Sequence, residues 1–438
     1  MVAPLKVGIA GLGTVGAEVV RLIETQARVL AGRSGRGIRV VAVTARSRAK
    51  KRSIDLRGVE WTRDPMALAT HPGIDCFVEL MGGAGDPALS AVEAALNAGK
   101  SVVTANKALL AKHGLKLAKA AETHGGALNY EAAVGAAIPV IKTLREGLAG
   151  TDINRVYGIL NGTCNYILTR MEQEGLSFAE CLKDAQRLGY AEANPSFDVD
   201  GHDTAQKLAI LASLAFGTKV AQSAVYVEGI SSIAPEDLRA ADELGYRLKL
   251  LGVAVRTAKG VEQRVHPTMV PKSSSIAQVM GVTNAVTIDG EGIPPITLVG
   301  PGAGGAATAS AVVADIADVA RGIRANPFGR PIAQLRDTRK APMERHEGGY
   351  YIRLLARDFP GTAAAIATRL AEQKISIESI VQRHPNGGAP PADGKAVPVP
   401  VILITYATHE DAVRRALAAV QKDKVISGRP QVIRIEKN

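Results

Sequence analysis

A strand, a glycine-rich turn and a helix follow one another at the N-terminus, and this order constrains the fold more than any other feature. Residues 5–10 (LKVGIA) are apolar, residues 11–16 (GLGTVG) form a GxGxxG turn, and an amphipathic stretch then reaches residue 23. In this setting the glycines permit a tight turn, close approach to a pyrophosphate and close helix packing, and the helix N-terminus favours negative charge. We therefore predict a dinucleotide site rather than an incidental glycine turn. The expected contacts are Gly11, Gly13, Thr14, Val15 and Gly16.

Strands continue to alternate with helices up to about residue 138. This alternation is typical of a parallel, doubly wound sheet of the Rossmann type. We assign residues 1–138 to a nucleotide-binding domain of the α/β class. The predicted strands lie at 38–44, 76–80 and 101–104, and the predicted helices at 87–98 and 107–123.

Two further units follow the first. Long helical stretches, with strand-like runs at 153–160 and 261–270, predict a central α+β domain at 139–322. We leave open whether its last helix, 308–322, returns to the first domain. Residues 323–348 contain three prolines and scattered charge, which suits a linker. Residues 349–438 show the order βαββαβ, with a Pro- and Gly-rich hairpin loop at 384–397, and this order is typical of a ferredoxin-like fold.

The second strand ends without the acidic residue that usually binds a ribose 2′-hydroxyl. Residues 44–48 read TARSR and contain no carboxylate. A guanidinium supplies charge and paired donors for a 2′-phosphate, whereas a carboxylate would repel it. We therefore expect NADP rather than NAD, with Arg46 as the phosphate ligand; a solvated loop without ligand contacts is the alternative.

The charge distribution and the cysteines limit the classes of partner. The net charge is +11, and residues 1–60 alone contain twelve Lys or Arg against four Asp or Glu, but aromatic residues make up only 4% of the chain. We expect no nucleic-acid binding, because no stacking platform accompanies the charge. Cys76, Cys164 and Cys181 form no CxxC pair, so we expect neither disulfides nor a zinc site. A reducing cytoplasm suits this chain, and neither a signal peptide nor a membrane span is expected.

Seven segments together resemble homoserine dehydrogenases, in the order in which that family has them. The resemblance implies an NAD(P)-dependent oxidoreductase that interconverts L-homoserine and L-aspartate 4-semialdehyde in threonine, methionine and isoleucine biosynthesis. It also implies that the central domain carries catalysis and dimerisation, within a homodimer or homotetramer. The segments are GLGTVG at 11–16, ELMGG at 79–83, VVTANKALLA at 102–111, NYEAAVGAAIP at 129–139, NGTCNYIL at 161–168, LGYAEANPSFDVDGHDTAQKLAIL at 188–211 and GPGAGGAATASAVVAD at 300–315.

Asp203 and Lys207 lie four residues apart on a predicted helix, so their side chains share one face. Such a pair is more often a plain surface ion pair, but residues 192–200 add further carboxylates beside this one lysine. Oxidation of an alcohol requires a group that takes the hydroxyl proton, and the reverse reaction requires the same group as an acid. The resemblance implies that Lys207 is this group and that Asp203 orients it.

The same resemblance supplies the other contacts of the site. Glu192 is expected to bind the substrate amino group, because a carboxylate complements an ammonium ion. Lys107 follows the fourth strand, at the sheet edge where α/β folds bind ligands, and is a second candidate for proton transfer. We expect Lys207 to act as acid and base and Lys107 to polarise the carbonyl. The remaining expected contacts are Asp198, Thr163 and Tyr190 for the substrate, and Thr104, Lys107 and Gly302 for the cofactor.

Residues 131–138 resemble the loop that binds a monovalent cation in this family. Carbonyl oxygens suit a hard cation such as Na+, and a tight connection without an ion is the alternative. Cys164 lies near the expected site, but no base accompanies it at catalytic spacing, so we expect a packed residue rather than a nucleophile. The implied cation ligands are the backbone carbonyls of Glu131, Val134, Ala136 and Ile138.

Residues 349–438 resemble an ACT domain, a small module that senses amino acids. The turn 357–361 (RDFPG) matches the ligand turn of that module. The resemblance implies an allosteric site at Asp358, Pro360 and Gly361, with L-threonine as the effector acting through contacts between subunits. A module kept only for assembly is the alternative.

Two other functions remain open at this point. Another semialdehyde dehydrogenase would need an acylatable cysteine with a base, and the sequence offers none. A non-catalytic amino-acid sensor built on residues 349–438 would leave two well-placed lysines without a role. The assignment depends on Lys107 and Lys207 opening onto one shared cleft.

Overall fold

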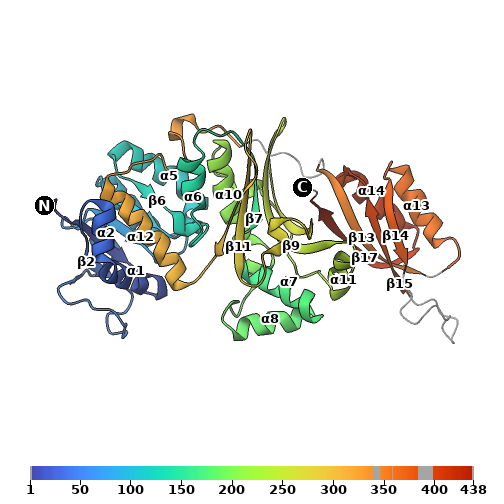
Figure 1. The fold of residues 1–438 in the computed structure, drawn as a ribbon, viewed down its shortest axis with the longest axis horizontal. Coiled ribbons are helices and arrows are strands. Elements are labelled where there is room, and N and C mark those ends of the chain that lie inside the picture. The colour runs from blue at the N-terminus through green and yellow to red at the C-terminus, as the bar shows by residue number, and fades with distance from the viewer. Residues whose placement is uncertain (1, 339–345, 358, 383–397, 437–438) are drawn as a thin grey trace.

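The computed structural model describes residues 2–338, 346–357, 359–382 and 398–436. Figure 1 shows an elongated molecule, with the N-terminal sheet at one end, a second sheet in the middle and a smaller unit at the other end. The last strand of the chain runs back from the far unit towards the middle of the molecule. The predicted loop at 384–397 lies outside the described residues, as do residues 339–345 of the predicted linker.

The N-terminal sheet has six parallel strands in the order β3-β2-β1-β4-β5-β6. Successive residues of a strand point to opposite faces, and here both faces are buried: Val7 and Ile9 pack in one apolar cluster, Ala10 and Phe77 in another. This confirms the predicted doubly wound sheet. Its strands are β1 (Leu5–Ala10), β2 (Ile38–Thr44), β3 (Glu60–Trp61), β4 (Cys76–Glu79), β5 (Ser101–Thr104) and β6 (Leu128–Asn129). Its helices are α1 (Thr14–Thr25), α2 (Ala27–Ser34), α3 (Pro65–Ala69), α4 (Ala88–Asn97) and α5 (Lys107–His124).

A helix from much later in the chain completes one face of this sheet. Helix α12 (Gly305–Arg321) packs against α1 and α2, and Figure 1 shows it lying among the first helices of the chain. Val312 and Ile316 of α12 join the same apolar cluster as Val7 and Ile9. The sequence left open whether this helix returns to the first domain. In the structure the apolar residues of α12 are buried against the N-terminal sheet. The N-terminal unit therefore needs residues on both sides of the central one.

The central sheet is mixed, and α10 (His202–Phe216) packs on its strands β7, β9 and β10. The sequence predicted strands only where β7 and β10 lie. Strand β9 was missed because its middle is buried on both faces, so it shows no alternation of polar and apolar residues. The sheet consists of β7 (Ile153–Ile159), β8 (Tyr226–Val227), β9 (Tyr246–Thr257), β10 (Gly260–Pro271), β11 (Thr283–Gly290) and β12 (Ile296–Pro301). The other helices are α6 (Val140–Lys142), which continues as a π-helical turn to Gly147, α7 (Gly162–Glu174), α8 (Phe178–Arg187), α9 (Ser196–Val199) and α11 (Pro235–Glu243).

The C-terminal unit follows the predicted order of elements and is joined to the central sheet. Its strands run in the order β17-β13-β15-β14, and β17 pairs in parallel with β10 through Thr268–Arg434 and Met269–Ile435. The two parts thereby form one continuous sheet of 11 strands. The elements are β13 (Glu347–Arg357), α13 (Thr362–Glu372), β14 (Ile377–Gln382), β15 (Pro398–Thr405), β16 (Thr408–His409), α14 (Glu410–Lys422) and β17 (Ile426–Ile435).

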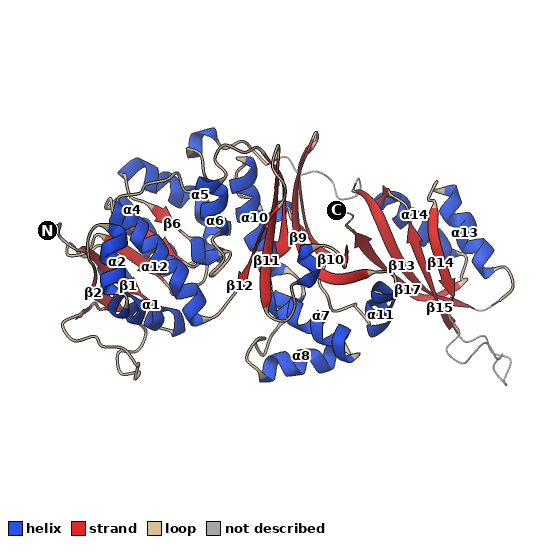
Figure 2. Ribbon diagram, viewed as in Figure 1, coloured by secondary structure: helices blue, strands red, loops and turns tan. Residues whose placement is uncertain are grey.

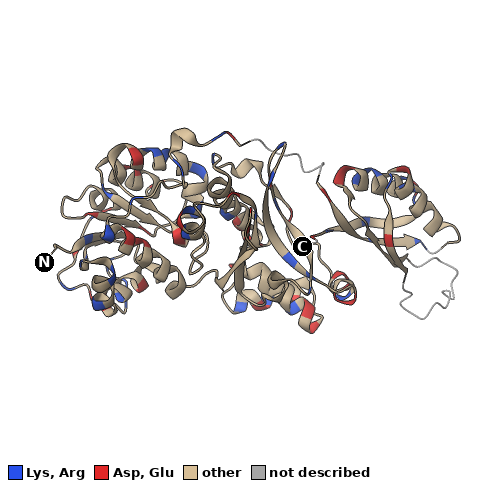
Figure 3. Cartoon of the chain, turned by 45° about the horizontal axis from the view of Figure 1, so that its top comes forward, with Lys and Arg blue, Asp and Glu red and all other residues tan. Residues whose placement is uncertain are grey.

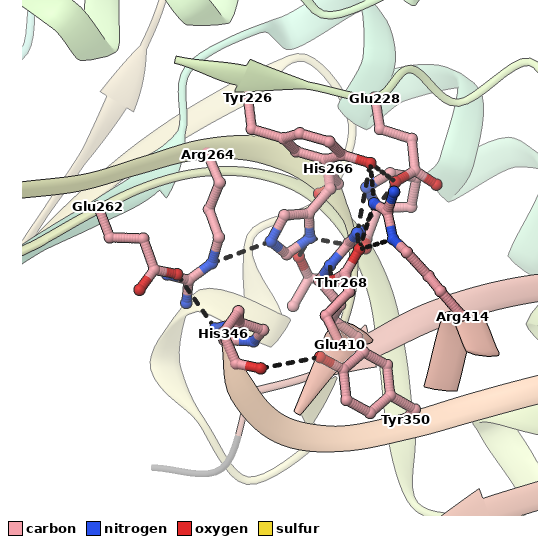
Figure 4. Close-up of polar contacts among 12 residues, drawn as sticks. Tyr226, Glu228, Glu262, Arg264, His266, Thr268, His346, Tyr350, Glu410 and Arg414 are labelled. Atoms are coloured by element: carbon pink, nitrogen blue, oxygen red, sulfur yellow. Dashed lines mark hydrogen bonds and ion pairs between the residues drawn. The ribbon is translucent and has the colours of Figure 1, made fainter. Parts of the chain in front are cut away.

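Buried charged residues hold this junction together. The Arg434 guanidinium, 3% exposed, donates to Glu410 at 2.7 Å and to Glu228 at 2.8 Å, so it links α14 to the segment after β8. Beside this cluster, Arg264 pairs with Glu262, and Glu262 also contacts His346 at 3.1 Å. Figure 4 shows these side chains converging from the central strands and from the C-terminal unit. A buried charge that loses its partner is strongly unfavourable, so the two parts are fixed to one another.

Charge is otherwise spread along the molecule. Figure 3 shows lysine, arginine and acidic residues interleaved along the described parts of the chain. None of the helices among the described residues combines the length and the apolar character needed to cross a membrane.

The junction gives a stability prediction. Replacement Glu410→Gln removes the carboxylate that neutralises Arg434 and should lower the free energy of unfolding by about 3 kcal/mol, because it leaves a buried cation with too little counter-charge. The matched control is Asp411→Asn in the same first turn of α14, whose partner Arg415 is exposed. Urea unfolding should show a clear loss for the first variant and almost none for the second. Equal effects of the two changes would contradict the prediction.

Candidate active site

Two cavities flank the glycine turn between β1 and α1. The first has a volume of about 730 Å³ and lies against Gly11, Gly13 and the loop after β2. The second has a volume of about 560 Å³ and lies between the N-terminal unit and the central sheet. Because the turn borders both cavities, a ligand that spans it can reach from one to the other. Residues of the second cavity include Val15, Lys107, Ala136, Asn161, Thr163, Tyr190, Asp198, Asp203, Lys207 and Gly302.

The glycine turn has the geometry that a dinucleotide requires. Gly11 has a φ of +103°, and a Cβ atom there would lie 2.5 Å from the Leu80 carbonyl oxygen. A Cβ at Gly16 would lie 2.0 Å from the Gly11 oxygen, so this glycine lets α1 pack on the turn. At Gly13 no atom lies within 4 Å of the Cβ position, which leaves the helix N-terminus open to a pyrophosphate. Thr14 begins α1, and its methyl group faces Gly305 of α12.

The far end of the first cavity is basic. Arg46, Lys50, Arg52 and Arg63 all line it. The Arg52 guanidinium donates to the carbonyl oxygens of Leu12, Lys50 and Ser47 at 2.8 to 3.0 Å, so its role is to fold the loop against the glycine turn. Arg46 lies on the same basic wall of the cavity.

Both candidate lysines contact the same carboxylate. In the second cavity, Lys207 donates to Asp203 at 2.9 Å and Lys107 lies 3.1 Å from the other oxygen of Asp203. Lys207 also donates to the Leu160 carbonyl oxygen at 2.7 Å. Lys107 begins α5 of the first unit and Asp203 belongs to α10 of the second, so the cleft is closed by a contact between the two units. The two lysines thus share the cleft that the sequence analysis requires.

The shared carboxylate is held in its ionised form. Burial by itself would raise the pKa of Asp203, but the charges of Lys207 and Lys107, with hydrogen bonds from Lys207 and Asn161, lower that pKa to about 2. Asp198 behaves differently, because burial and the nearby charge of Asp203 raise its pKa while a hydrogen bond from Asn161 lowers it. The site therefore contains one firmly charged carboxylate and a second whose charge depends on its neighbours.

Asn161 is a site residue that the sequence analysis missed. Its side-chain oxygen accepts a hydrogen bond from the Cys164 backbone N–H at 2.8 Å and so caps α7. Its amide nitrogen donates to Asp198 at 2.8 Å and to Asp203 at 3.0 Å. The segment NGTCNYIL contains the available signal, an asparagine just before a helix, which is a common capping position.

The expected substrate contacts are only partly brought together. Thr163, Tyr190 and Asp198 line the cavity, and the Thr163 hydroxyl donates to the Tyr190 carbonyl oxygen at 2.7 Å. Glu192 does not line it: the side chain is exposed on the loop before α9. The sequence placed Glu192 near the site by its position in a motif, but the loop turns it towards solvent.

The expected cofactor contacts after the fourth strand also need a correction. Gly302 lines the second cavity, but Thr104 is fully buried and its hydroxyl donates to Glu79 at 2.6 Å. Thr104 therefore supports the strand end and does not offer its side chain to a ligand. Glu79 accepts further hydrogen bonds from the backbone N–H groups of Met81 and Gly82, which shapes the loop beside the first cavity.

The loop that the sequence analysis expected to hold a cation is buried and sharply bent. Ala136 has a φ of 48°, a left-handed conformation that is uncommon for alanine. The carbonyl oxygens of Glu131 and Ile138 accept backbone hydrogen bonds from Val134 at 3.4 Å and Val140 at 2.8 Å. Each carbonyl keeps a second lone pair, and backbone carbonyl oxygens are the type of donor that suits a hard cation. Among the described residues, no three His, Cys, Asp or Glu side chains gather to hold a metal.

The cysteines are buried and unpaired. Cys164 contacts the Asp198 carbonyl oxygen at 3.2 Å, and burial raises the pKa of its thiol. A thiol in this state is a poor nucleophile. Acyl transfer through a cysteine in this cleft is therefore not supported.

At the far unit, a small hollow of about 90 Å³ lies beside the turn before α13. Gly361, Thr362 and Ala363 line it, and Gly361 has a φ of +90° at the start of the helix. Pro360 is exposed beside this hollow, and Asp358 lies outside the described residues.

Comparison with known proteins covers the whole chain. Residues 11–131 match the family model described as homoserine dehydrogenase, NAD binding domain, and residues 139–317 match the one described as homoserine dehydrogenase. A homoserine dehydrogenase of Pseudomonas aeruginosa is 45% identical, with 99% of each chain covered.

Solved structures give the same result. The crystal structure of a homoserine dehydrogenase from Thiobacillus denitrificans superposes with a TM-score of 0.91 at 42% identity, over 99% of this chain and 98% of that one. A hyperthermophilic archaeal homoserine dehydrogenase in complex with NADPH has a TM-score of 0.63 at 26% identity, over 73% of this chain and 98% of that one.

Proposed function

The chain belongs to the homoserine dehydrogenase family, and from this premise we propose which of its residues interconvert L-homoserine and L-aspartate 4-semialdehyde. The family membership makes it an NAD(P)-dependent oxidoreductase. The observation that carries the assignment of residues is the contact of Lys107 and Lys207 with one carboxylate, Asp203, in a cleft beside the glycine turn.

We assign proton transfer to Lys207. A bound NAD(P) would supply hydride transfer to and from the carbon that bears the hydroxyl. During oxidation the hydroxyl proton passes to the neutral amine of Lys207, and during reduction the Lys207 ammonium returns it to the carbonyl oxygen. An ammonium has three N–H donors, and Asp203 and the Leu160 carbonyl oxygen accept two of them. The third is free to point at the reacting oxygen, and Asp203 keeps the lysine in that direction.

Lys107 and Asp198 complete the assignment. Lys107 has its positive charge in the same cavity and polarises the carbonyl oxygen as negative charge develops on it. Asp203 is already occupied by two lysines, so Asp198 is the carboxylate of the cavity left to bind the substrate ammonium. Thr163 and Tyr190 border the same space. We leave Glu192 out of this assignment because its side chain lies outside the cavity.

We propose that the enzyme prefers NADP to NAD. Support comes from Arg46 and Lys50 on the wall of the first cavity and from the lack of a carboxylate at the end of β2. A 2′-phosphate would place about two negative charges beside these cations, whereas a ribose hydroxyl would leave them unpaired.

We further propose that the loop 131–138 binds Na+ through the carbonyls of Glu131, Val134, Ala136 and Ile138. The ion would supply a fixed positive charge that holds the loop in its bent form. The loop borders the second cavity through Val134 and Ala136, so its shape bears directly on the substrate space.

The C-terminal unit, in our proposal, is a ferredoxin-like ACT domain spanning residues 349–438, connected by a linker at 323–348. The strand order β17-β13-β15-β14 and the hollow beside Gly361 support it. The preceding domains would be 1–138, completed by α12, and the rest of 139–322. We propose L-threonine as the ligand of the turn at Asp358, Pro360 and Gly361, in a homodimer or homotetramer. A role in assembly alone is the alternative.

The first prediction separates the two lysines. Lys207→Met should lower kcat for homoserine oxidation by about 1,000-fold, as expected for loss of a general base. Lys107→Met should lower kcat less and raise KM more, because it removes charge stabilisation but leaves the base. Lys116→Met on the exposed face of α5 is the control. NADPH absorbance measures all three variants, and the reverse ranking of the first two would exchange the roles.

The second prediction concerns the cofactor. Arg46→Ala should reduce kcat/KM with NADP by roughly 10- to 100-fold, the effect of losing a charge-assisted hydrogen bond, and should change the value with NAD little. Arg48→Ala is the control, because Arg48 lies two residues along the same loop but stacks on Trp61 instead of lining the cavity. Equal efficiency with both cofactors, unchanged in Arg46→Ala, would contradict NADP preference.

The third prediction tests the regulatory proposal in the full-length chain, because truncation would remove Arg434 and Glu410 from a buried junction. Ala363→Leu narrows the hollow and should raise the L-threonine concentration for half-inhibition by at least about tenfold, which equals 1.4 kcal/mol of binding. Ala364→Leu, its exposed neighbour outside the hollow, should leave inhibition unchanged. A wild-type enzyme indifferent to millimolar threonine would overturn the proposal.

A further inference from the structure

The side chain of Asn161 uses every hydrogen-bonding position that its amide group offers towards the site. The amide oxygen accepts from the Cys164 backbone N–H, and the two N–H bonds of the amide nitrogen go to Asp198 and Asp203. This pattern fixes which end of the amide is oxygen, because the reverse orientation would place oxygen against two carboxylates and nitrogen against an N–H donor. Asn161 is 6% exposed, so these contacts are largely shielded from bulk solvent.

The two carboxylates that Asn161 joins have separate partners. Asp203 is bound by Lys107 and Lys207, whereas Asp198 has no lysine within ion-pair distance among the described residues. Like charges this close destabilise one another. A neutral donor between them relieves that repulsion without adding a cation that would compete with the substrate ammonium for Asp198.

We propose that Asn161 is a positioning residue that keeps Asp198 ionised and aimed at the substrate while leaving Asp203 to the two lysines. A lysine in its place would neutralise Asp198, and an apolar residue would leave both carboxylates without a shared donor. Asparagine donates to both carboxylates without adding a positive charge, and its oxygen also caps α7. This inference rests on the roles proposed above for Lys207 and Asp203.

The pH dependence follows from the groups around the amide. They come from every element packed there: Lys107 of α5, Cys164 of α7, Asp198 of α9, Asp203 and Lys207 of α10, and Tyr190 of the loop before α9. The hydrogen bond from Asn161 lowers the pKa of Asp198, against burial and the charge of Asp203, which raise it. Loss of this bond should therefore raise the pKa of Asp198. In a plot of kcat/KM against pH, the fall in activity on the acid side (the acid limb) should then move to higher pH.

The experiment uses two substitutions that keep the helix cap. Asn161→Asp keeps an acceptor for the Cys164 N–H, since aspartate and asparagine cap helices about equally well, but it removes both donors and adds a third carboxylate. Asn161→Ser also keeps a capping oxygen, and it replaces the two amide N–H donors with a single O–H on a shorter side chain. It therefore removes the bridge between the two carboxylates without adding charge. We expect kcat/KM for homoserine to fall about 100-fold in the first and about tenfold in the second. The acid limb should move up by about one pH unit in the first and by less in the second.

The matched control is Asn165→Asp, the same change one turn later on α7. The Asn165 amide donates to the carbonyl oxygens of Val279 and Thr283 and does not contact Asp198 or Asp203. It is also buried, and its side-chain oxygen accepts a hydrogen bond from Lys249 at 3.0 Å. The variant therefore tests whether a carboxylate added on the same helix, away from Asp198 and Asp203, moves the limb. Its acid limb should coincide with that of the wild type.

Three outcomes decide the matter. An acid limb in Asn161→Asp that coincides with the wild-type limb, whatever the rate, overturns the inference, as does an equal shift in Asn165→Asp. NADPH affinity, measured by fluorescence, verifies that each variant is folded; if Asn161→Asp fails this test, the Asn161→Ser limb decides alone. Retained turnover in Lys207→Met would instead refute the roles beneath the inference, so the two failures are distinguishable.

Discussion

The site depends on one ion-pair arrangement, in which Asp203 lies between Lys107 and Lys207. Two positive charges in a cleft repel one another, and a buried carboxylate between them removes that cost and fixes both ammonium groups. Lys107 is carried by the nucleotide-binding unit and Asp203 by the central one. The same contact therefore orients the proposed acid and base and joins the NAD(P)-binding unit to the central unit.

The fold supports this contact from both sides. Helix α10 packs on the central sheet, so the backbone that carries Asp203 and Lys207 is held by apolar contacts on its other face. Helix α5 starts directly after β5, at the carboxyl edge of the N-terminal sheet, and α12 returns to that sheet after the central strands. The chain passes from the N-terminal unit to the central sheet after β6 and returns with α12. These two chain connections and the Lys107–Asp203 ion pair together hold the two sides of the cleft.

The C-terminal unit connects to the same region through buried contacts. Arg434 binds Glu228, the next residue Gly229 packs tightly on the backbone of Val199 and Asp200, and the Ile230 N–H donates to the Val199 carbonyl oxygen at 2.9 Å. Asp198 is the adjacent residue. A ligand that altered the position of α14 or β17 would therefore act on a segment packed against the proposed substrate carboxylate, which gives the regulatory proposal a physical route.

The sequence by itself determined the elements whose signals are local: the glycine turn, the alternation around it, the order βαββαβ at the far end, and the shared helix face of Asp203 and Lys207. It did not determine β9, which is buried on both faces and shows no alternation. Only the tertiary structure decided that Asn161 bridges Asp198 and Asp203 and that Glu192 is exposed and does not line the cavity, because these depend on how distant segments meet. A pattern along the chain encodes which face a residue occupies, whereas the partner across that face is set by packing between segments far apart in the sequence.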